Sequence, residues 1–144
     1  MKILIINGPN LNMLGKRDED QYGSLTLSAI QNIIEDEFIK DEFEFFQSNL
    51  EGEIVTEIQR APVKYEGLII NPGGYTHTSV AIKDALEIIK IPKIEVHLSN
   101  VSSREEFRKV MITTPSTNGY VSGFKEDSYL AAVYLIKRIF KKAT

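Results

Sequence analysis

The sequence predicts an α/β fold in which a five-stranded parallel sheet is covered by helices on both faces. Short apolar runs alternate with helical patterns along the chain, which is typical of a parallel sheet with crossover helices. The 144 residues are enough for one substantial core. At this size the expected arrangement is flavodoxin-like, with three layers and strand order 2-1-3-4-5. We expect a single domain over residues 1–144.

The expected strands are short apolar runs, four of them buried and a fifth weaker. In chain order they are residues 3–6, 43–46, 68–70 and 94–98, and the weaker 119–124. Helices are expected where apolar residues recur every three or four positions. These segments are residues 26–40, 53–61, 78–90 and 127–142. Pro62 predicts the end of the second helix.

Polar and titratable residues follow the carboxyl ends of the predicted strands. Both histidines, His77 and His97, fall at this edge. The strand starts carry ordinary charged residues such as Lys2, Glu42 and Lys93. Ligands of open α/β sheets bind beyond the carboxyl ends of the strands. The asymmetry therefore predicts a site at this edge.

The connection between the first strand and the first helix, residues 8–23, is unusually long. It takes about sixteen residues, whereas strand-to-helix connections usually take about two to six. It also carries Arg17 and Tyr22. Because a guanidinium stabilises a nearby phenolate, this pair could act as a base near neutral pH. The alternative is a surface tyrosine that packs the loop onto the body.

Each histidine allows a functional and a structural interpretation. Glu95 and His97 are two residues apart on a predicted strand, so their side chains share a face. A carboxylate beside an imidazole fixes its tautomer, which suits a general acid or base, although His97 could simply be satisfied in the core. His77 lies just before a helix that Thr78 or Ser79 could cap. It could contact a polar substrate there, or be an ordinary loop residue.

Two further motifs at this edge are less specific. Gly73 and Gly74 lack the phosphate-loop patterns and predict a tight turn close to a small ligand. Arg104 and Arg108 are four residues apart, so on a helix they would face the same way. They could clamp a carboxylate or hydroxyls. The alternative is a solvated helix face paired with the neighbouring glutamates.

Composition excludes several classes of function. The formal charge of −3 gives no nucleic-acid footprint, and the lack of cysteine excludes disulfides and zinc–thiolate sites. No apolar stretch has membrane-spanning length and no signal peptide is expected, so we expect a cytoplasmic protein. The two histidines could suggest a metal, but only Glu95 offers a third ligand and the zinc-protease spacing is absent. We expect no metal.

The order of these motifs resembles the type II 3-dehydroquinate dehydratases over most of the chain. The matching stretches begin at residues 7, 22, 47, 71, 94 and 104, and they are NGPNLNMLGKR, YG, QSNLEG, NPGGYTHTS, IEVHLSN and REEFR. The resemblance implies a flavodoxin-like fold and reversible dehydration of 3-dehydroquinate to 3-dehydroshikimate in the shikimate pathway. It also implies a homo-oligomer, a dodecamer built from trimers, that needs no metal and no cofactor.

The resemblance implies a catalytic role for five residues. Tyr22 matches the base, a tyrosinate that removes the C2 proton, and Arg17 matches the cation that stabilises it. Asn10 matches the residue that holds a water against the developing enolate oxygen. His97, oriented by Glu95, matches the acid that protonates the departing C1 hydroxyl. The long loop is then expected to be a lid that excludes water and delivers Arg17 and Tyr22.

The resemblance also implies the substrate contacts. Asn71, His77 and Arg108 match residues that contact substrate hydroxyls, and the backbone of Leu98 and Ser99 matches the carboxylate site. Asp84 matches a residue that reaches the neighbouring subunit's site, although locally it is only a polar position on an amphipathic helix.

Three stretches depart from the family pattern. Asp18 and Glu19 replace a usual Glu-Pro, the stretch GFKEDSY from residue 123 replaces a glycine-rich turn, and residues 111–118 fit poorly. These departures are expected to lie outside the catalytic set. Two other classes stay open: a non-enzymatic module that binds a small anion, and a flavin or nucleotide domain, which would lack a phosphate-loop pattern.

Overall fold

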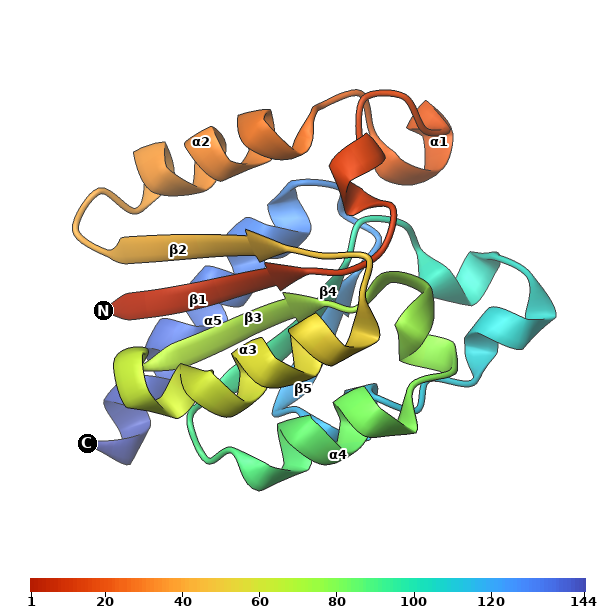
Figure 1. Cartoon of the computed structure of the whole chain (residues 1–144). Coiled ribbons are helices and arrows are strands. Elements are labelled where there is room, and N and C mark those ends of the chain that lie inside the picture. Colours follow the sequence, from red (N-terminus) through yellow and green to blue (C-terminus); the bar gives the residue numbers. More distant parts are fainter.

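A five-stranded parallel sheet forms the centre of the molecule, which is described here by a computed structural model of residues 1–144 (Figure 1). The strands are β1 (Lys2–Asn7), β2 (Glu42–Gln47), β3 (Gly67–Asn71), β4 (Lys93–His97) and β5 (Gly119–Ser122). Their order in the sheet is β2-β1-β3-β4-β5, and every neighbouring pair is parallel. The predicted flavodoxin-like order is confirmed.

Helices cover both faces of the sheet, with two of the five helices on each face. The helices are α1 (Glu19–Tyr22), α2 (Leu27–Glu37), α3 (Glu51–Lys64), α4 (Val80–Ile88) and α5 (Asp127–Ala143). Ile3 and Ile5 of β1 belong to the core under α2 and α5, whereas Leu4 and Ile6 belong to the core under α3 and α4. Alternate residues of one strand thus enter opposite cores, which explains why the central strands are apolar throughout. No helix combines the length and the apolar character needed to span a membrane.

Side-chain hydrogen bonds cap the first turns of two of these helices. Thr26 Oγ1 accepts a hydrogen bond from the Ala29 amide at 3.1 Å at the start of α2. Ser79 Oγ accepts one from the Ile82 amide at 3.0 Å at the start of α4, so Ser79 is the cap. Both satisfy amides that have no partner within the helix.

The prediction that Pro62 ends the second predicted helix, residues 53–61, is wrong. Helix α3 continues through Pro62 to Lys64. Pro62 lacks an amide hydrogen and so removes one helical hydrogen bond, and only Val63 and Lys64 follow it in the helix. A bond from the Tyr65 amide to the Ala61 carbonyl at 2.9 Å closes the helix end.

The second strand was expected to be buried, but it is only partly buried. β2 is an edge strand in which Glu42 and Glu44 are exposed. Phe43 and Phe45 pack at the margin of the core beside α2 and remain partly exposed. Phe46 packs at the margin of the opposite core, so β2 contributes to both cores but is only partly buried.

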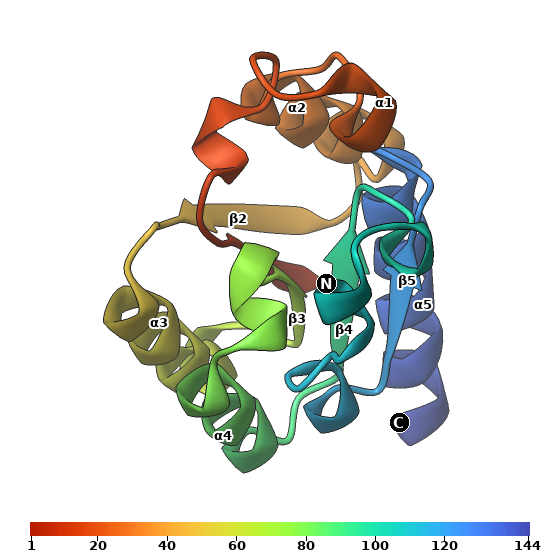
Figure 2. The ribbon, with the colours of Figure 1, turned by 90° about the vertical axis from the view of Figure 1, so that its right-hand side faces the viewer.

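The long connection after β1 is ordered at its start. Leu11 and Leu14 are buried in the core beside α2 and α5, and residues Leu11–Met13 form a 3₁₀ turn. The later part carries the short helix α1, which lies above the carboxyl ends of the strands (Figures 1 and 2). Both chain termini lie at the opposite end of the sheet. The two ends of the sheet therefore differ as the sequence predicted.

Candidate active site

A pocket of about 110 Å³ lies at the carboxyl ends of β1, β3 and β4. Its lining includes most of the side chains that the sequence singled out, namely Asn10, Arg17, Tyr22, Asn71, His77, His97, Leu98, Ser99 and Arg108. Glu95 lies behind His97 and is completely buried. Asp84 is exposed on α4 and does not line the pocket of its own chain.

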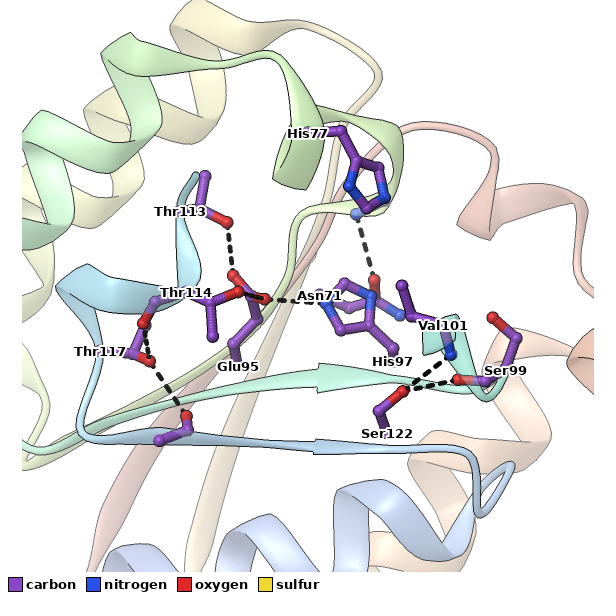
Figure 3. Close-up of polar contacts among 12 residues, drawn as sticks. Asn71, His77, Glu95, His97, Ser99, Val101, Thr113, Thr114, Thr117 and Ser122 are labelled. Atoms are coloured by element: carbon purple, nitrogen blue, oxygen red, sulfur yellow. Dashed lines mark hydrogen bonds and ion pairs between the residues drawn. The ribbon is translucent and has the colours of Figure 1, made fainter. Parts of the chain in front are cut away.

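Glu95 and His97 form a buried pair at the end of β4 (Figure 3). His97 Nε2 lies 2.8 Å from Glu95 Oε2, as their spacing on the strand predicted. Only 7% of the His97 side chain and none of the Glu95 side chain is exposed. If Glu95 is ionised it can only accept, so Nε2 carries the shared hydrogen. The other ring nitrogen, Nδ1, is then left for chemistry in the pocket.

Two threonines complete the surroundings of Glu95. Thr113 Oγ1 donates to Glu95 Oε1 at 2.5 Å, and Thr114 Oγ1 donates to Glu95 Oε2 at 2.5 Å. Residues 111–118 were expected to lie outside the catalytic set, but these two residues hydrogen-bond to Glu95, the partner of His97. Sequence spacing could not find them because they reach β4 from a distant turn. The only signal in the sequence was that both residues carry a hydroxyl and lie in a stretch that departs from the family pattern.

The outer wall of the pocket comes from the long connection. Arg17 Cζ lies 3.6 Å from the centroid of the Tyr22 ring, so the guanidinium contacts the phenol as predicted. Arg104 Cζ lies 5.1 Å from the same centroid. Burial lowers the pKa of Arg17, and Arg104 and Arg108 act in the same direction while Tyr22 opposes them. Several cations thus surround one phenol, which suits a ligand or a phenol that bears negative charge.

Asn71 is held by a buried polar chain. Its Nδ2 donates to Tyr129 Oη at 3.2 Å, and Tyr129 Oη donates to Asn7 Oδ1 at 2.5 Å. Asn71 Oδ1 accepts from the Gly73 amide at 3.1 Å. Complete burial raises the pKa of Tyr129, so its hydroxyl remains a neutral donor. The second amide hydrogen of Asn71 is available to a ligand.

Close backbone packing shapes the floor of the pocket. A Cβ on Gly8 would lie 2.5 Å from the Pro72 carbonyl oxygen, so the loops after β1 and β3 meet backbone to backbone. Gly73 has φ of 61°, as the predicted tight turn requires. Asn10 has φ of 69°, a left-handed conformation that asparagine tolerates better than most residues. Its place in the pocket is therefore set by the turn.

His77 is oriented from outside its own loop. Its Nδ1 lies 2.8 Å from the carbonyl oxygen of Val110, which makes Nδ1 the donor. In neutral His77 the other nitrogen, Nε2, is then an acceptor at the pocket.

Arg104 and Arg108 do not share one helix. Arg104 follows the 3₁₀ turn Val101–Ser103, and Arg108 belongs to the next turn, Glu106–Lys109. Both nevertheless line the pocket, and Arg108 Nε also donates to Glu105 Oε2 at 2.6 Å. The pairing with a neighbouring glutamate is confirmed for Arg108, and the clamp stays a prediction. Arg104, which the resemblance left without a role, is a pocket residue.

No group of three or more histidine, aspartate or glutamate side chains lies close enough together to hold a metal ion. The pocket instead combines an oriented imidazole, a phenol beside guanidinium groups, and amide donors. Fold and pocket together define an α/β protein equipped for proton transfer on a small polar ligand.

Comparison with known proteins gives the family. Residues 1–137 match the family described as "Dehydroquinase class II", and the chain belongs to that family. It is 54% identical to the 3-dehydroquinate dehydratase of Fusobacterium nucleatum, over 95% of this chain and 97% of that one. It is 48% identical to the 3-dehydroquinate dehydratase of Thermotoga maritima over the full length of both. A crystal structure of type II dehydroquinase from Butyrivibrio crossotus, 45% identical, superposes with a TM-score of 0.92 over 95% of this chain and 97% of that one.

Proposed function

We propose that this protein catalyses the reversible dehydration of 3-dehydroquinate to 3-dehydroshikimate, a step of the shikimate pathway of aromatic amino-acid biosynthesis. Membership of the class II dehydroquinases supports the reaction. The observation that carries it is one pocket lined by the Arg17–Tyr22 pair and by His97, whose partner Glu95 lies behind it.

The first step is removal of a proton from C2 of the substrate. This proton is acidic because C2 lies beside the C3 ketone. Tyr22, as a phenolate stabilised by the Arg17 guanidinium, takes the proton, and the C–H electron pair forms an enolate with its charge on the C3 oxygen. A water held by Asn10 donates a hydrogen bond to that oxygen.

The second step is loss of the C1 hydroxyl. The enolate re-forms the ketone, a double bond forms between C1 and C2, and the bond from C1 to oxygen breaks. His97 protonates the departing oxygen from Nδ1, so that water leaves. The hydrogen bond between Nε2 and Glu95 orients the ring. Exchange with solvent then returns a proton from Tyr22 to His97.

The remaining pocket residues hold the substrate. We propose that Asn71, His77 and Arg108 contact its hydroxyls. The backbone of Leu98 and Ser99 binds its carboxylate. Proton transfer α to a ketone is accomplished by acid–base groups alone, so the proposed reaction uses no metal and no cofactor.

We propose that the later part of residues 8–23 acts as a lid. The buried side chains of Leu11 and Leu14 fix its start. Gly15 and Gly23, with φ of 93° and 80°, flank the segment that carries Arg17 and Tyr22 and are suitable hinges. Opening at these points would admit substrate without moving the sheet.

We also propose a cytoplasmic homo-oligomer, a dodecamer built from trimers, in which Asp84 completes the site of a neighbouring subunit. Asp84 shares an exposed helical stripe with Val80 and Ile88, which are 59% and 67% exposed. Val80 and Ile88 each lie four residues from Asp84, and exposed apolar side chains on one helical face suit a subunit contact. Sedimentation should detect the oligomer, and a fully active monomer would contradict this part of the proposal.

The test of the reaction is direct. Purified protein, treated with a chelator, is mixed with 3-dehydroquinate, and the ultraviolet absorbance of the conjugated enone product is followed. A protein-dependent rise is expected. A flat trace from folded protein would contradict the proposal and favour a non-enzymatic module that binds a small anion.

A further inference from the structure

One short segment outside the strands hydrogen-bonds to His77 and to Glu95, the partner of His97. In residues 110–114, the Val110 carbonyl accepts from His77 Nδ1, and the hydroxyls of Thr113 and Thr114 donate to Glu95, the partner of His97. Figure 3 shows the two threonines beside Glu95, on the side of the carboxylate away from His97. Except for Val110, the segment lies in residues 111–118, which fit the family pattern poorly.

Glu95 has a complete set of donors. Its carboxylate is entirely buried, and both oxygens accept hydrogen bonds, from Thr113, Thr114 and His97. A buried carboxylate without such donors would be costly. His97 is the only titratable group hydrogen-bonded to it. Because every other partner donates, the arrangement suits a carboxylate that accepts from His97 Nε2.

The threonines themselves are fixed in place. The amides of Ile112 and Thr113 both donate to the Thr76 carbonyl, at 2.8 and 3.3 Å. Thr117 Oγ1 donates to the carbonyls of Thr114 and Gly119, at 2.7 and 3.0 Å. These contacts join the segment to the loop of His77 on one side and to β5 on the other. The two hydroxyls are therefore delivered to Glu95 by an anchored turn.

We propose that Thr113 and Thr114 are positioning residues, which hold the Glu95 carboxylate so that it fixes the ring orientation and the Nε2–H tautomer of His97. The proposal rests on the proposed function, in which His97 is the acid. The threonines touch neither the substrate nor the reacting atoms. Their removal should slow the step that needs His97 and leave substrate affinity nearly unchanged.

The test compares substitutions that differ only in the hydroxyls. Thr113→Val with Thr114→Val removes both hydroxyls at nearly constant volume, whereas Thr113→Ser with Thr114→Ser keeps them. Ser116→Ala is the matched control, because the Ser116 hydroxyl lies buried in the same turn with no hydrogen-bond partner. The readouts are kcat and KM for 3-dehydroquinate.

The double valine variant should lose roughly 10- to 100-fold in kcat, a part of the roughly 100- to 10,000-fold that a general acid contributes. Its KM should change by less than about threefold, since ground-state contacts remain. The double serine variant and Ser116→Ala should keep kcat within about threefold of the wild type. An unchanged kcat in the valine variant, or an equal loss in the serine variant, would overturn the proposal while the proposed function stands.

A second readout does not depend on turnover. Nitrogen-15 NMR of the neutral His97 ring should show the Nε2–H tautomer alone in the wild type and in the serine variant. The valine variant should show a mixture of both tautomers. A single Nε2–H tautomer in the folded valine variant would overturn the proposal, even if the wild type proved to have no dehydratase activity.

Discussion

The two walls of the pocket are built in different ways. The inner wall is formed by strand ends, where Asn71, Glu95 and His97 are buried and each side chain has hydrogen-bond partners. The outer wall carries Arg17 and Tyr22, which are only partly buried and contact each other by stacking. The inner wall cannot move without disturbing the sheet, whereas the outer wall can. Folding fixes the proposed acid, and closure of the outer wall delivers the proposed base.

The largest effect is expected at the outer wall. Tyr22→Phe removes the proposed base but keeps the ring, so kcat should fall by roughly 100- to 10,000-fold. Because Tyr22 is only partly buried, thermal stability should stay close to that of the wild type. Steady-state assays measure the first quantity and calorimetric binding of the product checks that the site is intact. If turnover survives, Tyr22 is not the base.

A smaller loss of activity, but a larger loss of stability, is expected at the inner wall. Glu95→Gln keeps the shape of the side chain, but an amide cannot accept from Thr113, Thr114 and His97 together. One buried donor is left without a partner or opposite another donor, at a cost of about 1–3 kcal/mol. Chemical denaturation and kcat should therefore change together. A variant that loses activity at wild-type stability would contradict the contrast between the walls.

A contact between the outer wall and the rest of the molecule should have a modest effect. Lys125 Nζ donates to the Asp20 carbonyl, which joins the charged turn after β5 to α1. Lys125→Ala should raise KM by a factor of about two to five, since an exposed hydrogen bond contributes up to about 1 kcal/mol. Lys16→Ala, on an exposed lysine of the same connection, is the control and should leave KM unchanged. Equal effects of the two variants on KM would show that the contact from Lys125 to α1 does not aid substrate binding.

The smallest effect on activity is expected at the far end of the sheet. Burial raises the pKa of Asp41, but hydrogen bonds from Lys137 and the amino terminus outweigh it and lower the pKa. A lowered pKa in the folded state gives stability that is present above the unfolded pKa and lost as pH falls through the folded pKa. Asp41→Asn should cost about 1 kcal/mol at neutral pH and leave kcat unchanged.

Thermal unfolding from neutral to acidic pH checks this prediction. The difference in stability between wild type and Asp41→Asn should shrink as pH falls below about 4, where the aspartate becomes protonated. A difference that is constant with pH would show that the charge of Asp41 is not what stabilises this end.

Sequence patterns predicted what depends on local residue type. The central strands are apolar because both faces are covered, and their order placed the polar strand ends in one pocket. The errors arose where distant contacts decide. Pro62 is accommodated near the end of a helix, and β2 is only partly buried because it is an edge strand. Thr113 and Thr114 lie in the connection between β4 and β5 and hydrogen-bond to Glu95. Residue spacing in the sequence does not predict this contact.

Exchange of the C2 proton tests directly whether the outer wall supplies the base and the inner wall the acid. In His97→Asn the proposed base is intact and the acid is missing, so 3-dehydroquinate in deuterated buffer should exchange its C2 proton faster than in enzyme-free buffer, with little product formed. Tyr22→Phe should abolish this protein-dependent exchange. Proton NMR follows both. Exchange that persists in Tyr22→Phe, or that disappears in a folded His97→Asn protein that still binds product, would contradict the account.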